Sequence, residues 1–171
     1  MQRFVETHYT RTWVHVTHRF VASMYRLVAY YEILAAAWSA TFTWNGLAHS
    51  GVLVPWPWVL LIFGALLLVG AAGAMLLRRR EAGEVLTYVA QALQVPYVAV
   101  GPVAFRFVAG LQASVLVTAG RLSYFIGVAT SITLWRPDNG APTAIGLNFV
   151  PIMILIALAC LPTPAIVSGG N

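Results

Sequence analysis

Lysine is absent from this chain of 171 residues, aspartate and cysteine each occur once, and charged residues make up only 9% of the sequence. An ordinary soluble domain carries about a quarter charged residues. A chain with so little charge cannot cover a surface that faces water, so we expect a lipid bilayer to cover most of the molecule. The single cysteine, Cys160, excludes an internal disulfide bond.

The usual catalytic motifs are also missing. The lone aspartate, Asp138, lies in a turn-rich stretch, and the one carboxylate pair at helical spacing, Glu81 and Glu84, is typical of a solvated helix start. There is no glycine-rich phosphate loop, no HExxH motif and no cluster of cysteine and histidine. We therefore predict no catalytic, cofactor-binding or metal-binding residue and no cofactor. Whether the chain is part of an enzyme stays open.

Long apolar runs are what the sequence has in place of charge. Hydrophobic residues make up 60% of the chain, and the runs 27–44, 52–77 and 143–167 are each long enough to cross a hydrocarbon core of about 30 Å. The segment 107–135 is also apolar, and its small residues are typical of membrane helices that pack closely. We therefore predict an all-α integral membrane protein with about four transmembrane helices. These are expected at 21–44, 59–77, 107–135 and 143–161.

The region between the second and third predicted spans is less regular. Residues 81–106 begin like a helix, but glutamine, glycine and proline residues interrupt the second half. We predict an interfacial helix followed by a broken or re-entrant stretch, and a complete span is the alternative. The predicted organisation is an interfacial N-terminal segment, 1–20, followed by one polytopic transmembrane helical domain, 21–171.

Arginine and tryptophan positions predict an orientation. Arginines precede the first predicted span and, as Arg78, Arg79 and Arg80, directly follow the second, whereas the link between the two spans has none. Basic residues are in excess on the cytoplasmic side of membranes, so we place the N-terminus and the arginine triplet on the cytoplasmic (or matrix or stromal) side. Trp56 and Trp58 then mark the opposite interface. The basic residues flank spans and form no single face, so we expect no nucleic acid as a partner. The expected partners are the lipid bilayer and other membrane protein subunits.

The segment ahead of the first span mixes aromatic and basic residues in the order RTWVHVTHRF. Such a mixture suits the headgroup region better than the apolar core of a bilayer. We predict an interfacial anchor made by Arg11, Trp13, His15, His18 and Arg19. The two histidines are three positions apart and share a helix face, which makes them candidate ligands of a metal or haem. No other histidine has a matching depth on a second predicted span, so we favour the anchor.

Three charges fall inside predicted spans, where an arginine at the centre costs roughly 2.5–3.5 kcal/mol. Arg26 is close to the start of its span, so its long side chain can reach the interface. Glu32 lies deeper and needs a partner, and Arg121 on the third predicted span is our first choice. We predict a structural pair between Glu32 and Arg121. A contact with a neighbouring subunit and a path for protons or substrate are the alternatives.

Residues near the N-terminus also follow a distinctive order. They are Phe4-Val5-Glu6, then Arg11-Thr12-Trp13-Val14-His15-Val16, then His18 and Phe20. This order resembles the approach to the first transmembrane helix of the callose synthases, the plant-type 1,3-β-glucan synthases. Glu32 falls where that family tends to have glutamine, and Trp44-Asn45 resembles the aromatic-Asn pair at the end of its helix.

The resemblance covers about a quarter of the chain. Extra residues separate Glu6 from Arg11, the helix is longer before Asn45, and beyond residue 46 the similarity is one of topology alone. The large cytosolic glycosyltransferase domain of that family is missing from this chain. The resemblance therefore implies a membrane-scaffold part of a glucan synthase, and it brings no catalytic residue with it.

Three functions remain open from the sequence. The first is a non-catalytic transmembrane scaffold module that resembles the membrane region of a 1,3-β-glucan synthase. The second is a small supernumerary subunit of a larger respiratory or photosynthetic membrane complex, where its role is packing. A channel or transporter that uses Glu32 and Arg121 is the third and the weakest, because the predicted spans have little polar lining. We rank the scaffold module slightly ahead of the supernumerary subunit.

Overall fold

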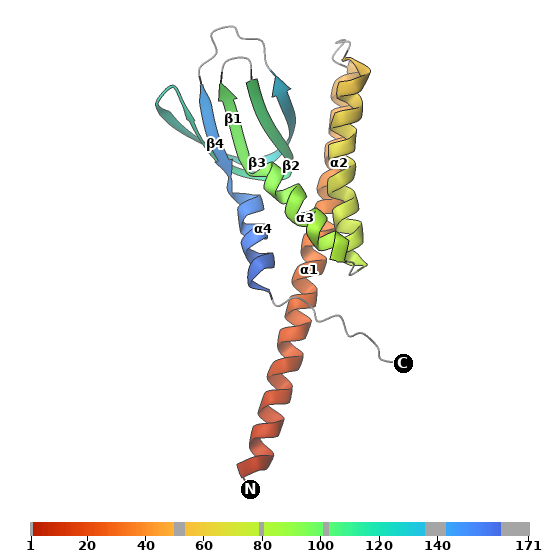
Figure 1. Ribbon diagram of the computed structural model, residues 1–171, viewed down its shortest axis with the longest axis vertical. Helices are drawn as coiled ribbons and strands as arrows, with labels where there is room; N and C mark the ends of the chain where they lie inside the picture. Colours follow the sequence, from red (N-terminus) through yellow and green to blue (C-terminus); the bar gives the residue numbers. More distant parts are fainter. Residues whose placement is uncertain (1, 50–53, 79–80, 101–102, 136–142, 162–171) are drawn as a thin grey trace.

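The computed structural model describes residues 2–49, 54–78, 81–100, 103–135 and 143–161. The order of elements in this part of the chain is α1 (Gln2–His49), α2 (Trp56–Leu77), α3 (Glu81–Gln94), β1 (Pro96–Val100), β2 (Val103–Thr118), β3 (Arg121–Trp135), β4 (Ala144–Asn148) and α4 (Phe149–Cys160). Helices α1 and α2 lie side by side, and the strands form a separate layer beside them (Figure 1). The prediction of an all-α fold is therefore wrong.

Helices α1 and α2 form an antiparallel hairpin because small residues let their backbones approach. Gly70 of α2 lies against Ala36, and a Cβ atom at Gly73 would lie 2.6 Å from the carbonyl oxygen of Ala29. The prolines before and inside the first turn of α2 suit a helix start, where a backbone N–H has no partner in any case. Among the described residues, α2 is the one helix that is long and apolar enough to cross a membrane. The prediction of four such helices is wrong.

The four strands make an antiparallel sheet in the order β1-β4-β2-β3, with an additional pairing between β1 and β2. Strand β2 organises the sheet. Its first residues pair with β1, its last residues pair with β4, and β3 pairs with it from Thr118↔Arg121 to Arg106↔Thr133. One edge of β2 therefore pairs with the two short strands β1 and β4, and the other edge pairs with the long strand β3.

The segment 107–135, which we predicted as the third span, is most of a β-hairpin. Ala119 and Gly120 have positive φ angles of 48° and 74°. Two such residues in succession give the two-residue turn whose twist matches that of paired strands. The chain therefore reverses at this point, and a continuous helix is impossible there.

The fourth predicted span, 143–161, is also divided. Its first part is β4, and its second part is α4, whose 12 residues extend about 18 Å at 1.5 Å per residue. That length is well below the thickness of a hydrocarbon core. After the arginine triplet, α3 supplies the expected helix, but Pro96–Val100 forms β1, so this region is neither a re-entrant loop nor a span.

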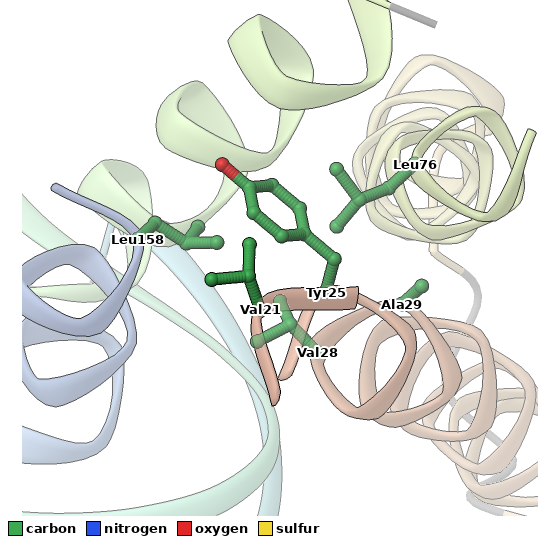
Figure 2. Close-up of a cluster of buried hydrophobic side chains, with 6 residues drawn as sticks. All are labelled: Val21, Tyr25, Val28, Ala29, Leu76 and Leu158. Atoms are coloured by element: carbon green, nitrogen blue, oxygen red, sulfur yellow. The ribbon is translucent and has the colours of Figure 1, made fainter. Parts of the chain in front are cut away.

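Two apolar clusters join the layers through α1. Figure 2 shows the first, in which Tyr25 of α1 lies between Leu76 of α2 and Leu158 of α4. Its other buried members are Val21, Val28 and Ala29. The second joins the helical hairpin and α3 to the sheet and consists of Ala36, Leu66, Val69, Ala90, Phe107 and Ala109. The N-terminal half of α1 extends beyond the rest of the molecule (Figure 1).

Candidate interaction surface

Glu32 is fully buried between α1 and α3. Its Oε2 atom accepts a hydrogen bond from Thr87 Oγ1 at 2.9 Å, and its Oε1 atom accepts one from Gln91 Nε2 at 3.0 Å. Both donors are neutral side chains one turn apart on α3. Gly73 closes the α2 side, because a Cβ atom there would lie 3.0 Å from Glu32 Cβ. The carboxyl group of Glu32 therefore connects two helices through neutral donors.

Arg121, the partner that we predicted for Glu32, lies elsewhere. It begins β3, pairs with Thr118 across the two-residue turn and is exposed to solvent. The expectation placed it inside a helix, whereas the hairpin puts it at the end of a strand. The structure thus gives Glu32 two partners on α3 and does not bring Glu32 and Arg121 together.

The structure describes only part of the predicted interfacial anchor. The backbones of Arg11, Trp13, His15, His18 and Arg19 belong to α1, but their side chains lie outside the described part of the structure, as do residues Arg79 and Arg80. Trp56 and Trp58 are exposed in the first turn of α2, and Arg78 is exposed at its C-cap. Helix α2 therefore carries tryptophan at one end and arginine at the other.

Two buried amide side chains complete the hydrogen bonding of β2. Gln94 Oε1 accepts from the backbone N–H of Ala109 at 3.0 Å, and Asn148 Oδ1 accepts from that of Ala113 at 3.1 Å. These two N–H groups lie in the stretch of β2 between its pairing with β1 and its pairing with β4. Sequence reasoning missed both residues, and treated Gln94 as an interruption. The available signal was a glutamine in an otherwise apolar helix end.

The same two hydrogen bonds show which way the backbone of β3 points. Ala109 and Ala113 direct their N–H groups away from β3, and they pair with Thr130 and Ile126. These are non-hydrogen-bonded antiparallel pairs, in which both residues direct their backbone N–H and C=O groups away from the partner strand. The even-numbered residues of β3 therefore direct N–H and C=O toward the outer edge. Within the described residues β3 pairs with β2 alone, so this edge is open.

One face of the sheet is apolar, uncharged and exposed across three strands. In β3 the alternating residues Leu122, Tyr124 and Ile126 are 73%, 83% and 81% exposed. Residues paired directly across strands share a face, so the register extends this surface into β2 and β4. We call it the β-face, and it consists of Leu111, Val117, Leu122, Tyr124, Ile126, Val128, Ile145 and Leu147. Contiguous apolar surface of this kind marks a site of protein or membrane contact.

Helix α1 carries a second apolar surface next to the sheet. Exposed side chains recur every three or four positions and so share one side of the helix. We call them the α1 stripe, and they are Leu27, Tyr30, Leu34, Trp38 and Phe42. Neighbouring residues of α1 contact the sheet: a Cβ atom at Gly110 would lie 2.7 Å from Ala35 Cβ, and Thr130 Oγ1 donates to Ser39 Oγ at 2.8 Å.

Thr130 continues the row of alternating residues that includes Ile126 and Val128. The β-face therefore begins where α1 stops covering the sheet. The α1 stripe lies beside the α1 residues that contact the sheet, Ala35 and Ser39. In the described part of the chain, no group of three or more His, Cys, Asp or Glu residues could hold a metal ion. The two apolar surfaces are accordingly the strongest candidate for a functional site.

Comparison with known proteins adds no relative: no protein-family profile, curated protein or solved structure matches the chain. The resemblance of the N-terminal residues to callose synthases stays a prediction.

Proposed function

We propose that this protein is a non-catalytic structural subunit of a membrane assembly, in which lipid and neighbouring protein together cover its apolar surfaces. The observation that carries the proposal is the continuous, uncharged β-face beside the α1 stripe. A surface of that extent is unfavourable in water, because each buried square ångström of apolar area contributes roughly 25 cal/mol. A subunit that packs against other components removes this area from water.

Helix α2 supports a membrane location. Only 28% of its most apolar 18-residue window is buried within the molecule, whereas the core helix of a soluble protein is mostly buried. Leu60, Leu61 and Leu67 are among its exposed residues. Exposed tryptophans at one end and Arg78 at the other are typical of helices that meet headgroups at both ends.

The position of the sheet supports a partner protein as well as lipid. Phe107 and Ala109 of β2 pack with Leu66 and Val69, which lie near the middle of α2. If α2 crosses a bilayer, the sheet therefore lies at the depth of the hydrocarbon. Lipid tails offer no hydrogen-bond partner to the open edge of β3, and open sheet edges are not found exposed to lipid. Protein must then cover that edge, as it does in a subunit of an assembly.

Extraction of membranes with alkaline carbonate tests the proposal. We expect the wild-type chain, expressed in cells, to remain in the washed membranes. Leu67→Arg places a charge on the exposed side of α2 and should release most of the protein into the wash, because an arginine at the centre of a span costs roughly 2.5–3.5 kcal/mol. Ala82→Arg, on the exposed surface of α3, is the matched control and should stay with the membranes. Release of the wild-type chain would contradict the proposal.

The resemblance of residues 4–20 and of Trp44-Asn45 supports a second hypothesis, that the chain is a membrane module of a 1,3-β-glucan synthase. The expected likeness in topology is lost, because two of the four predicted spans contain strands. Two measurements on the native material test this hypothesis: denaturing mass spectrometry gives the mass of the polypeptide, and a separate assay measures glucan formation from UDP-glucose. A species far above 18.5 kDa that converts UDP-glucose into glucan would support it, and a mass near 18.5 kDa without that activity would oppose it.

A further inference from the structure

We infer that β3 is the dimerisation edge of this protein: the β3 strands of two copies pair antiparallel about a two-fold axis and join their sheets into one. This inference rests on the proposed function, because it names a protein that covers the open edge of β3. It commits to a second copy of the same chain as the occupant.

The backbone of β3 is suited to pairing along its length. Its even-numbered residues direct N–H and C=O outward, and from Arg106↔Thr133 to Thr118↔Arg121 its register with β2 is unbroken. Protected edges carry lysine, proline, a bulge or an inward-pointing charge. From Leu122 to Thr133 the strand has no charged residue and no proline. The strand is thus an unprotected template for another strand.

The chemistry of the edge selects a strand over lipid or a helix. Lipid tails have no donors or acceptors, and the backbone groups of a helix are already paired within the helix. An added strand satisfies the whole row of outward N–H and C=O groups at once, and its alternating side chains extend the apolar face. The occupant of the edge is therefore an extended segment of protein.

The charge of Arg121 sets the direction in which two copies of β3 would pair. Arg121, the charged residue of the strand, lies at one end, so antiparallel pairing separates the two guanidinium groups by roughly 45 Å at about 3.4 Å per residue. Parallel pairing would place them side by side, and like charges directly opposite each other are unfavourable.

The uneven cover of β3 is the property that favours a second copy as the occupant of the edge. Thr130 of β3 contacts α1 and Ile132 packs against the second apolar cluster, whereas Leu122, Tyr124 and Ile126 are exposed. If the two-fold axis passes at Val128, Ile126 lies opposite Thr130 of the second copy. The exposed half of each strand then lies beside the helix-covered half of the other. Both α1 helices lie on the same side of the joined sheet, where they flank the paired β-faces.

The mass of the full chain in detergent micelles tests the inference, measured by light scattering with the contribution of detergent removed. We expect the wild-type protein to have twice the monomer mass of 18.5 kDa. Ile126→Pro should reduce the mass to that of a monomer, because it removes an outward N–H and leaves the hydrogen bonds to β2 in place. Ile126→Val keeps the N–H and the branched side chain, and should stay dimeric.

Hydrogen exchange of the wild-type protein gives a test that needs no variant. The amides of Leu122, Tyr124, Ile126 and Val128 should be protected at high protein concentration and should exchange faster on dilution. A monomeric wild-type chain, a dimeric Ile126→Pro variant, or amides that exchange equally fast at both concentrations would each overturn the inference. A misfolded Ile126→Pro variant, identified by a changed circular dichroism spectrum, leaves the decision to the exchange measurement.

The two proposals fail in different ways. If the wild-type chain is monomeric but remains in carbonate-washed membranes, the inference of β3 pairing is wrong and the proposal of a membrane subunit stands. If the chain is dimeric but is released by the wash, β3 pairing stands and the proposal of a membrane subunit is wrong.

Discussion

The backbone N–H of Ala113 donates to Asn148 Oδ1 at 3.1 Å, and the same oxygen accepts from the N–H of Val150 at 3.3 Å. Asn148 is the N-cap of α4 and the last residue of β4. One buried side chain therefore ends a strand, begins a helix and satisfies an N–H of β2 that no strand reaches. This relationship holds α4 at a defined place under the sheet.

Two substitutions of Asn148 should distinguish the contribution of the helix cap from that of the hydrogen bond to Ala113. Asn148→Ala loses the cap and leaves the N–H of Ala113 without a partner. We expect the free energy of unfolding to fall by about 2–4 kcal/mol, since a cap contributes about 1 and an unsatisfied buried donor costs about 1–3. Asn148→Ser restores a capping oxygen but is too short to reach Ala113, so its loss should be smaller by about the value of the cap. Urea unfolding of both variants measures the difference, and equal losses would show that the cap contributes nothing.

Replacement of Glu32 tests whether the carboxyl group is a structural connection. In Glu32→Gln, the new amide can accept from Gln91 and donate to the hydroxyl of Thr87, which also accepts. We expect a loss of stability within about 1 kcal/mol. Glu32→Leu leaves both Thr87 Oγ1 and Gln91 Nε2 buried without this acceptor, at about 1–3 kcal/mol for each. Denaturant unfolding distinguishes the two variants. An equally severe loss of function in both, with folding intact, would instead indicate that Glu32 acts by titration.

Much of the helical part was predictable because its signals are local. Helices are present within the predicted segments 21–44 and 59–77, and the run of apolar residues that defines α2 is visible in the sequence. The burial of Glu32 was also expected. Its partners were not, because Thr87 and Gln91 are more than 50 residues away and only the packing of α3 on α1 brings them together.

The sheet was missed because an apolar segment with small residues fits both a helix and a buried strand. Two signals for strand were present in 107–135. Leu122, Tyr124, Ile126 and Val128 recur at every second position, and all the residues between them except Phe125 are small or polar (Ser123 and Gly127), which is the period of a strand. Ala119-Gly120 supplies a turn at the centre of the segment. The role of Gln94 could not be predicted, since it depends on a gap between two pairings of β2 that are set by tertiary structure.

Close contact between α1 and α2 should depend on Gly73. A methyl group there would lie 2.6 Å from the carbonyl oxygen of Ala29, which is backbone and cannot move aside cheaply. We expect Gly73→Ala to lower the melting temperature, with a cost of about 1–3 kcal/mol typical of overpacking. Gly64, on the same helix, has nothing within 4 Å of its would-be Cβ atom. Gly64→Ala is thus the control, and it should leave the melting temperature unchanged or raise it, because alanine is the better helix former.

The turn of the β2–β3 hairpin offers a stabilising change. Ala119 has a φ of 48°, in the left-handed region that costs an ordinary residue roughly 1–2 kcal/mol. Asparagine tolerates this conformation and is favoured in two-residue turns before glycine. We therefore expect Ala119→Asn to raise the free energy of unfolding by up to about 1 kcal/mol. Ala119→Val should lower it, because a branched side chain clashes most in this region. Urea unfolding measures both, and an unchanged Val variant would mean that the turn does not limit the stability of the hairpin.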